Sequence, residues 1–132
     1  MCVIISRLCF KFTPIDPEEI TSILEWSPSG MHKMGERSPE NRLVSNNFWA
    51  TELVRRKTRD VGLVVSEAVN IMSAKADKIT AIASHDNVES YLGVTVSYES
   101  ELPFINISTR DLAKLAGLAL DLDVDLFPQG SL

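Results

Sequence analysis

Hydrophobic and polar residues alternate in four separate stretches of the chain, and this period of two predicts β-strands. The four stretches are residues 2–12, 46–54, 88–98 and 120–127. In the first of them, Ile4, Leu8 and Phe10 share the face that we expect to be buried. In the last, leucine and valine alternate with three aspartates. Each strand therefore offers one face to a core and one face to solvent.

Apolar residues at spacings of three and four predict helices, each preceded by a residue that can cap a helix. The predicted helices begin after Asp16, after Asp60 and after Ser108 or Thr109. The middle stretch, residues 60–84, is long enough for one continuous helix or for two helices that meet near residues 73–77. Residues 26–45 contain two prolines and two glycines and predict a long loop.

The order of these elements predicts a single α+β domain over residues 1–132. We expect a two-layer sandwich related to the ferredoxin-like plan, with a mostly antiparallel sheet and helices packed on one face. Arg7 and Lys11 lie on the polar face of the first strand, where they would oppose the aspartates of the last strand. The charges therefore predict that the first and last strands are neighbours.

Cysteine usage and hydropathy indicate a cytoplasmic protein. Cys2 and Cys9 are an odd number of residues apart in one predicted strand, so their side chains leave opposite faces and cannot form a disulfide. Arg7 and Lys11 interrupt the apolar N-terminus, which argues against a signal peptide. No apolar run approaches the roughly 20 residues that span a bilayer, so we expect no membrane association.

The middle of the chain is basic, although the protein as a whole is acidic. Residues 33–59 contain seven Lys and Arg against three Glu, a net charge of +4, in a chain whose net charge is −5. Basic residues in a glycine-containing loop can hold a phosphate or a carboxylate. The candidate ligand-binding residues are therefore His32, Lys33, Arg37, Arg42, Trp49, Arg55 and Arg56. The alternative is that the tryptophan is core and the arginines belong to a solvated strand-to-helix connection.

The aspartates Asp121, Asp123 and Asp125 resemble the start of a calcium-binding loop, but the later positions do not fit. That motif requires glycine at its sixth position and glutamate at its twelfth, where this chain has Leu126 and Leu132. A solvated sheet face is the better interpretation. Neither histidine of the chain lies at ligand spacing from a second ligand. We therefore expect neither a metal nor a cofactor.

Several of these features together resemble a bacterial family known as domain of unknown function 4279. The resemblance rests on the Pro17-Glu18-Glu19-Ile20-Thr21 helix start, the loop from Pro28 to Gly35-Glu36, Trp49 in the following strand, and the closing strand with alternating aspartates. It spreads over most of the chain and implies a compact α+β fold. It brings no established activity or cofactor, so function has to be argued from the residues themselves.

Three functions from different classes are compatible with this sequence. The first is a non-enzymatic module that binds an unknown partner protein or a small anionic ligand through residues 30–42 and 55–59. The second is nucleic-acid binding by the same residues, which the acidic total charge argues against. The third is an enzyme that uses Cys9, His32 or His85, although no catalytic motif surrounds them. Formation of a homodimer through the outer sheet face is compatible with each of these functions.

Overall fold

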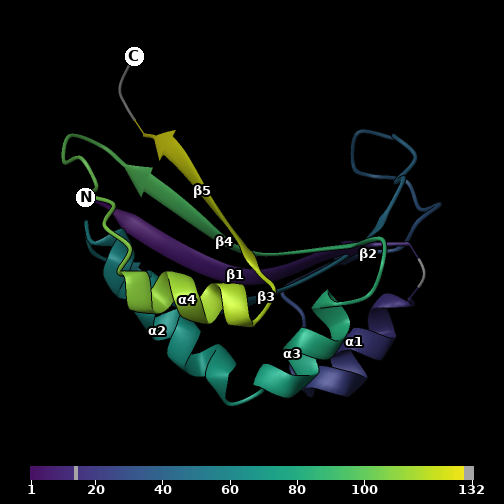
Figure 1. Cartoon of the computed structure of the whole chain (residues 1–132). Helices are drawn as coiled ribbons and strands as arrows, with labels where there is room; N and C mark the ends of the chain where they lie inside the picture. Colours follow the sequence, from purple (N-terminus) through teal and green to yellow (C-terminus); the bar gives the residue numbers. More distant parts are fainter. Residues whose placement is uncertain (14, 130–132) are drawn as a thin grey trace.

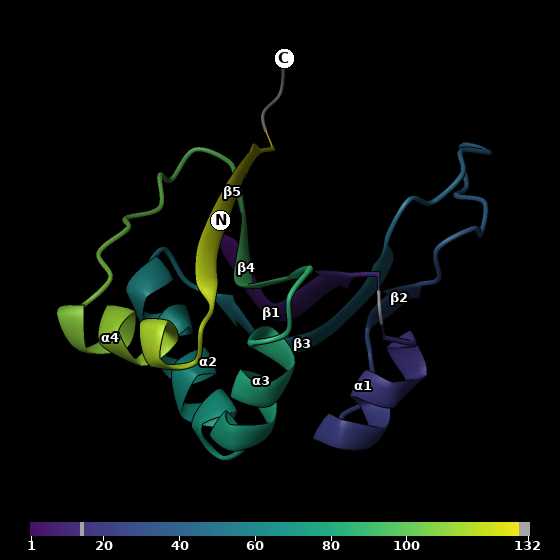
Figure 2. The same ribbon diagram turned by 45° about the vertical axis from the view of Figure 1, so that its right-hand side comes forward.

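The computed structural model describes residues 1–13 and 15–129. Its elements, in chain order, are β1 (Val3–Phe12), α1 (Pro17–Leu24), β2 (Gly30–His32), β3 (Asn47–Lys57), α2 (Val61–Ser73), α3 (Ala76–Ala83), β4 (Val88–Tyr98), α4 (Thr109–Gly117) and β5 (Asp121–Pro128). The helices lie on one face of a five-stranded sheet (Figure 1). The opposite face carries no helix in the described part of the chain, and we call it the open face (Figure 2).

The sheet is mixed, with the strand order β2-β3-β1-β4-β5. β1 lies in the centre and pairs antiparallel with both β3 and β4, while β2 pairs antiparallel with β3. β5 pairs with β4 in the parallel direction. The predicted α+β class with helices on one face is therefore confirmed. Among residues 1–13 and 15–129, no helix has the length and apolar character that crossing a bilayer requires.

The predicted adjacency of the first and last strands is wrong, because β4 lies between β1 and β5. Two parallel strands need a long crossover connection, and α4 supplies it between β4 and β5. β5 therefore takes the edge beside β4. Arg7 and Asp123 still share one row of the open face, on either side of Gly93. The opposite charges thus face each other across β4.

The core lies between the sheet and the helices, on the face that the alternation predicted. Ile4, Leu8 and Phe10 are fully buried there. Trp49 of β3 is also fully buried, and its ring centroid lies 6.0 Å from that of Phe10. Its indole N–H donates a hydrogen bond of 2.9 Å to the hydroxyl of Thr21. Trp49 therefore fixes α1 against the sheet.

The helix starts are confirmed, because the side chains of Asp16, Asp60 and Ser108 each accept a hydrogen bond from an amide of the first turn. The 60–84 stretch consists of two helices, α2 and α3, which meet at Ala74 and Lys75. The ammonium of Lys75 donates to the last carbonyl of α1, at Leu24. This bond fixes the junction between α2 and α3 to the C-terminal end of α1.

The C-terminal end of α4 has a left-handed residue. Ala119, just after α4, has a left-handed φ of 60°. The amides of Leu120 and Ala119 donate to the carbonyls of Leu115 and Ala116, both at 3.0 Å, which is the Schellman pattern in which glycine is the usual left-handed residue.

At the start of α2, a Cβ on Gly62 would lie only 2.2 Å from the backbone oxygen of Asn106. The loop before α4 therefore packs directly against the α2 backbone.

Residues 26–45, predicted as one long loop, include regular hydrogen-bonded structure. They contain β2, and farther on Arg37 and Leu43 form an isolated antiparallel bridge that closes a hairpin. In both ribbon views, the β2–β3 connection rises on the open side of the sheet (Figures 1 and 2). A three-residue strand is too short to show a period of two, so the sequence pattern does not reveal it.

Candidate ligand-binding cleft on the open sheet face

One row of the open face crosses four strands and brings together side chains of different chemistry. His32 of β2 pairs with Phe48 of β3, Phe48 pairs with Lys11 of β1, and Lys11 pairs with Glu89 of β4. Directly opposed residues of neighbouring strands have their Cβ atoms roughly 5 Å apart, so adjacent members of the row are side by side. The row therefore offers an aromatic half, a central ammonium and a carboxylate.

Two hollows meet at Lys11, and together we call them the Lys11 cleft. The first has a volume of about 290 Å³ and is lined by Lys11, Thr13, Asn46, Asn87, Val88 and Glu89. The second has a volume of about 380 Å³ and is lined by Lys11, His32, Leu43, Val44, Ser45, Asn46 and Phe48. The first hollow is mostly polar and the second mostly apolar. The shared residues, Lys11 and Asn46, stand at the boundary between them.

Lys11 is the cation of the cleft. Its side chain is exposed near the end of β1, and it forms no ion pair with the residues that the structure describes. Glu89, directly opposite on β4, is the carboxylate that would compete for this ammonium. A ligand anion at Lys11 therefore gains a charge-assisted hydrogen bond without first breaking an ion pair within the protein.

The aromatic half of the cleft is formed by His32 and Phe48. Their rings are stacked, with centroids 5.2 Å apart and an angle of 28° between the planes. Leu43 lines the same hollow from the hairpin and is 64% exposed. These side chains together provide an accessible apolar wall beside a positive charge.

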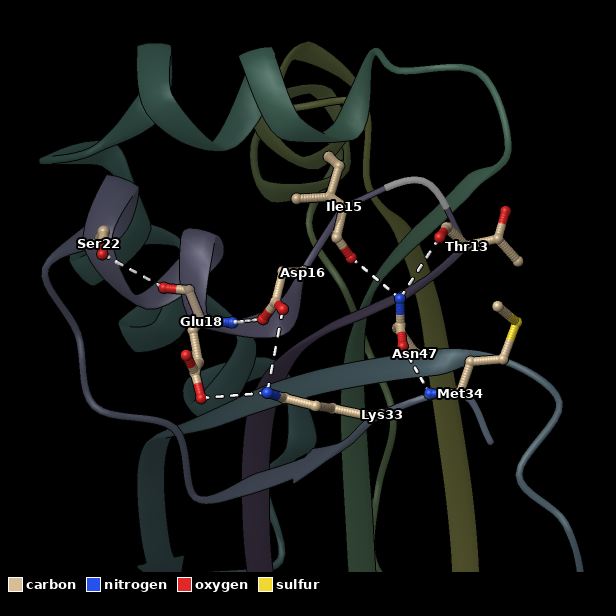
Figure 3. A network of polar contacts seen from close by, with 8 residues as sticks. All are labelled: Thr13, Ile15, Asp16, Glu18, Ser22, Lys33, Met34 and Asn47. Carbon is tan, nitrogen blue, oxygen red and sulfur yellow. Dashed lines mark hydrogen bonds and ion pairs between the residues drawn. The ribbon is translucent and has the colours of Figure 1, made fainter. Parts of the chain in front are cut away.

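The base of the β2–β3 connection is anchored by Asn47, as Figure 3 shows. The side-chain oxygen of Asn47 accepts from the Met34 amide at 2.6 Å. Its side-chain nitrogen donates to the carbonyls of Ile15 at 3.0 Å and Thr13 at 3.4 Å. Asn47 is 8% exposed, so these bonds are mostly shielded from water. This one amide therefore ties two other parts of the chain, at Met34 and at Thr13 and Ile15, to β3 beside the cleft.

Lys33, a predicted ligand-binding residue, lies in the same network (Figure 3). Its ammonium is 3.2 Å from a carboxylate oxygen of Glu18 and 3.9 Å from one of Asp16. The hydrogen bond to Glu18, followed by the charge of Asp16, raises the pKa of Lys33. Lys33 therefore fastens the loop to the start of α1, while its neighbour His32 lines the cleft.

The other predicted site residues are spread over the molecule. Arg37 donates to the Asn41 carbonyl at 3.1 Å within the hairpin, and Arg42 is exposed in the same hairpin without lining either hollow. Trp49 is in the core, which was the alternative interpretation. Arg55 and Arg56 belong to β3, so they are strand residues and not a connection. The structure thus brings only His32 of the predicted set into the cleft.

The two β3 arginines are paired with carboxylates. Arg55 forms an ion pair with Glu52 on its own strand at 2.7 Å. Arg56 forms a two-pronged pair with Glu67 of α2. The hydrogen bonds from these guanidinium groups lower the pKa of both Glu52 and Glu67. These two arginines of the basic segment are therefore each neutralised by a neighbouring glutamate.

The open face also holds a buried thiol. Cys9 is 5% exposed, and burial raises the pKa of its thiol from 9.0 to about 11. Burial, followed by the proximity of Cys9, raises the pKa of Tyr91 on the neighbouring strand to about 12. The nucleophilic form of cysteine is the thiolate. At neutral pH Cys9 is therefore protonated, which argues against its use as an enzymatic nucleophile.

Lys11, Asn46 and Phe48 are among the cleft residues that the sequence pattern does not identify as ligand-binding. The alternation did place Lys11 on the outer face of its strand, but Lys11 lies outside the basic segment 33–59. Only the pairing of β1 with β3 and β4 brings it to the base of the hairpin. The sequence signal for Lys11 is thus only a basic residue on the solvent face of a strand, a feature that many strands share.

The fold and the cleft define a small α+β protein with helices on one face of a mixed sheet and a mixed polar and aromatic hollow on the other. The chain belongs to the family described as domain of unknown function (DUF4279), whose family model matches residues 7–128. The matched region begins within β1 and extends to the end of β5, so it contains all the other helices and strands. No curated protein and no solved structure matches the chain.

Proposed function

We propose that this protein is a small, non-enzymatic binding module that holds a small anionic ligand in the Lys11 cleft. The observation that carries the proposal is the position of Lys11, an ammonium at the boundary of two adjoining hollows and outside the ion pairs formed by the described residues. The stacked His32 and Phe48 supply apolar contact beside it. The sequence predicts a site in residues 30–42 and 55–59, and this proposal centres the site instead on Lys11, at the base of the β2–β3 connection.

The pairing of the arginines supports a small ligand over a nucleic acid. A nucleic-acid surface needs several cations that are available to phosphates along a strand or helix. Here Arg55 and Arg56 are each paired with a glutamate, and the open face also carries the exposed Asp121, Asp123 and Asp125. A long polyanion would therefore meet both occupied cations and repulsive carboxylates.

A thermal-shift experiment tests this proposal. The protein is heated with acetate, benzoate or phosphate at constant ionic strength, and a ligand that binds only the folded state raises the unfolding temperature. We expect at least one of these anions to stabilise the wild type but not Lys11→Met. Lys57→Met is the matched control, because Lys57 is an exposed lysine at the other end of the same face. It should retain the full shift.

The same experiment also tests a site at Arg37 and Arg42, two of the residues that the sequence predicts to bind a ligand. We expect Arg37→Ala/Arg42→Ala to respond to anions as the wild type does. A response that is lost in this double variant and kept in Lys11→Met would place the site in the hairpin. The absence of a shift with all three anions would overturn the proposal of anion binding.

A partner protein is the second candidate, and a specific observation favours it. Leu102, Phe104 and Ile105, in the connection from β4 to α4, are 64%, 51% and 49% exposed. Clustered exposed apolar side chains are typical of interaction surfaces. Loss of a captured partner after Phe104→Ser, with anion binding unchanged, would support a separate protein-binding surface.

Three broader expectations belong to the same proposal. The free thiols of Cys2 and Cys9 support a reducing, cytoplasmic location. The antiparallel β3-β1-β4 centre of the sheet supports a relation to the ferredoxin-like plan. The uncovered open face supports a homodimer formed through it, and sedimentation that shows only monomer at high concentration would dismiss this assembly.

A further inference from the structure

We infer that the Lys11 cleft selects a monocarboxylate that carries an aromatic ring, with the carboxylate at Lys11 and the ring against the His32–Phe48 wall. This inference rests on the proposed function and names the chemical class of the ligand. It follows from three properties of the cleft, which are its division into two halves, its charge balance and the geometry of its aromatic pair.

The division of the cleft sets the shape of the ligand. The larger hollow, about 380 Å³, falls within the range of small-molecule sites, and Leu43, Val44 and Phe48 give it apolar walls. Lys11 stands at its border with the polar hollow. A ligand that fills both environments has an apolar body with a charged group at one end.

The charge balance of the cleft sets the charge of the ligand. Lys11 is the one lysine or arginine among the described lining residues of the two hollows, and Glu89 is opposite it on β4. A phosphate dianion or a polyphosphate would bring more negative charge toward Glu89 than a single ammonium can balance. A monocarboxylate brings one charge and can accept from Lys11 while Asn46 offers its amide.

The aromatic pair sets the chemistry of the body. His32 and Phe48 are already stacked on one another at 5.2 Å, and His32 is exposed while Phe48 is half-buried. A third ring can therefore pack against this pair with part of its surface removed from water. Aromatic pairs gain stability beyond the burial of their area, so a flat aromatic ring is favoured over a saturated ring of the same size.

Isothermal titration with benzoate, cyclohexanecarboxylate, acetate and phosphate tests the inference. We expect benzoate to bind about threefold or more tightly than cyclohexanecarboxylate, which has the same charge and a saturated ring. We expect acetate and phosphate to bind more weakly than either ring compound. In Phe48→Leu, which keeps an apolar side chain, the preference for benzoate over cyclohexanecarboxylate should disappear.

Two further variants keep the test independent of folding effects at Phe48. His32→Ala changes an exposed side chain and should also reduce the preference for the aromatic ring. Glu89→Gln removes the competing carboxylate and should tighten the binding of benzoate and acetate by a similar factor. If acetate and benzoate bind the wild type equally, the ligand class is wrong while anion binding stands. If none of the four compounds binds, both the ligand class and the proposed function are overturned.

Discussion

Asn47 anchors the base of the β2–β3 connection beside the cleft, and its replacement by alanine tests this role. Its side-chain amide makes three hydrogen bonds, to the Met34 amide and to the carbonyls of Ile15 and Thr13. Asn47→Ala removes all three and adds no steric conflict. The Met34 amide loses its only described partner, since Asn47 is the acceptor that the structure gives it.

The expected cost follows from these contacts. A hydrogen bond contributes about 0.5–1.5 kcal/mol net, and a buried group left without a partner costs about 1–3 kcal/mol. The bond to Thr13 is long, at 3.4 Å, so we count mainly the other two. The sum is about 2–3 kcal/mol. Unfolding entropy is about 2.1 cal/mol/K per residue, so for 132 residues the unfolding temperature should fall by about 7–11 °C.

Asn46→Ala is the matched control for this measurement. Asn46 is the adjacent residue of the same type, but it is exposed and donates no side-chain hydrogen bond to the described residues. Surface substitutions of this kind change stability by about 0.5 kcal/mol or less. Thermal unfolding followed by circular dichroism compares the two variants. Equal, small losses for Asn46→Ala and Asn47→Ala would refute the anchoring role of Asn47.

Three further predictions concern backbone geometry and pH. Ala119→Gly should stabilise the protein by about 0.5–1 kcal/mol, because glycine adopts the left-handed φ without strain, whereas Ala113→Gly within the same helix should destabilise it by about 1 kcal/mol. Gly62→Ala should cost about 1–3 kcal/mol because its Cβ meets a backbone oxygen, while Gly117→Ala, with open space around it, should be neutral or stabilising in urea unfolding. The raised pKa of Cys9 means that the unfolded thiol loses its proton first, so this contribution to stability is present below pH 9 and lost as the pH rises toward 11. Cys9→Ala should show a shallower loss of stability across that window, and identical pH profiles would contradict it.

Local signals account for the parts of the fold that the sequence predicted. The caps Asp16, Asp60 and Ser108 act on amides within three residues, so their role can be read from the sequence next to them. The burial of β1 follows in the same way from its own alternation. Trp49 is an intermediate case, because its strand was predicted while its burial depends on contacts with Phe10 and Thr21.

Non-local pairing explains what the sequence could not give. The position of β5 in the sheet depends on the crossover through α4, which the charges of the strands do not reveal. The opposite charges of β1 and β5 suggest that these strands are neighbours, but β4 lies between them. In the sequence, Arg56 has no obvious acidic partner and is therefore a candidate to bind an anion. Its partner Glu67 lies on a different element, α2. Lys11 does not stand out in the sequence for the same reason. The residues around it come from three other strands and from the hairpin.

The most direct test of the Lys11 cleft is a titration of ¹⁵N-labelled protein with benzoate, followed by two-dimensional amide NMR spectra. A ligand in the cleft should move the amide signals of Lys11, His32, Asn46 and Phe48 first and most, and the same titration of Lys11→Met should leave them in place. The signals of Arg55 in the wild type should stay unchanged. Shifts centred on Arg55 or on the tip of the hairpin, or no shifts at any residue, would contradict the assignment of the cleft.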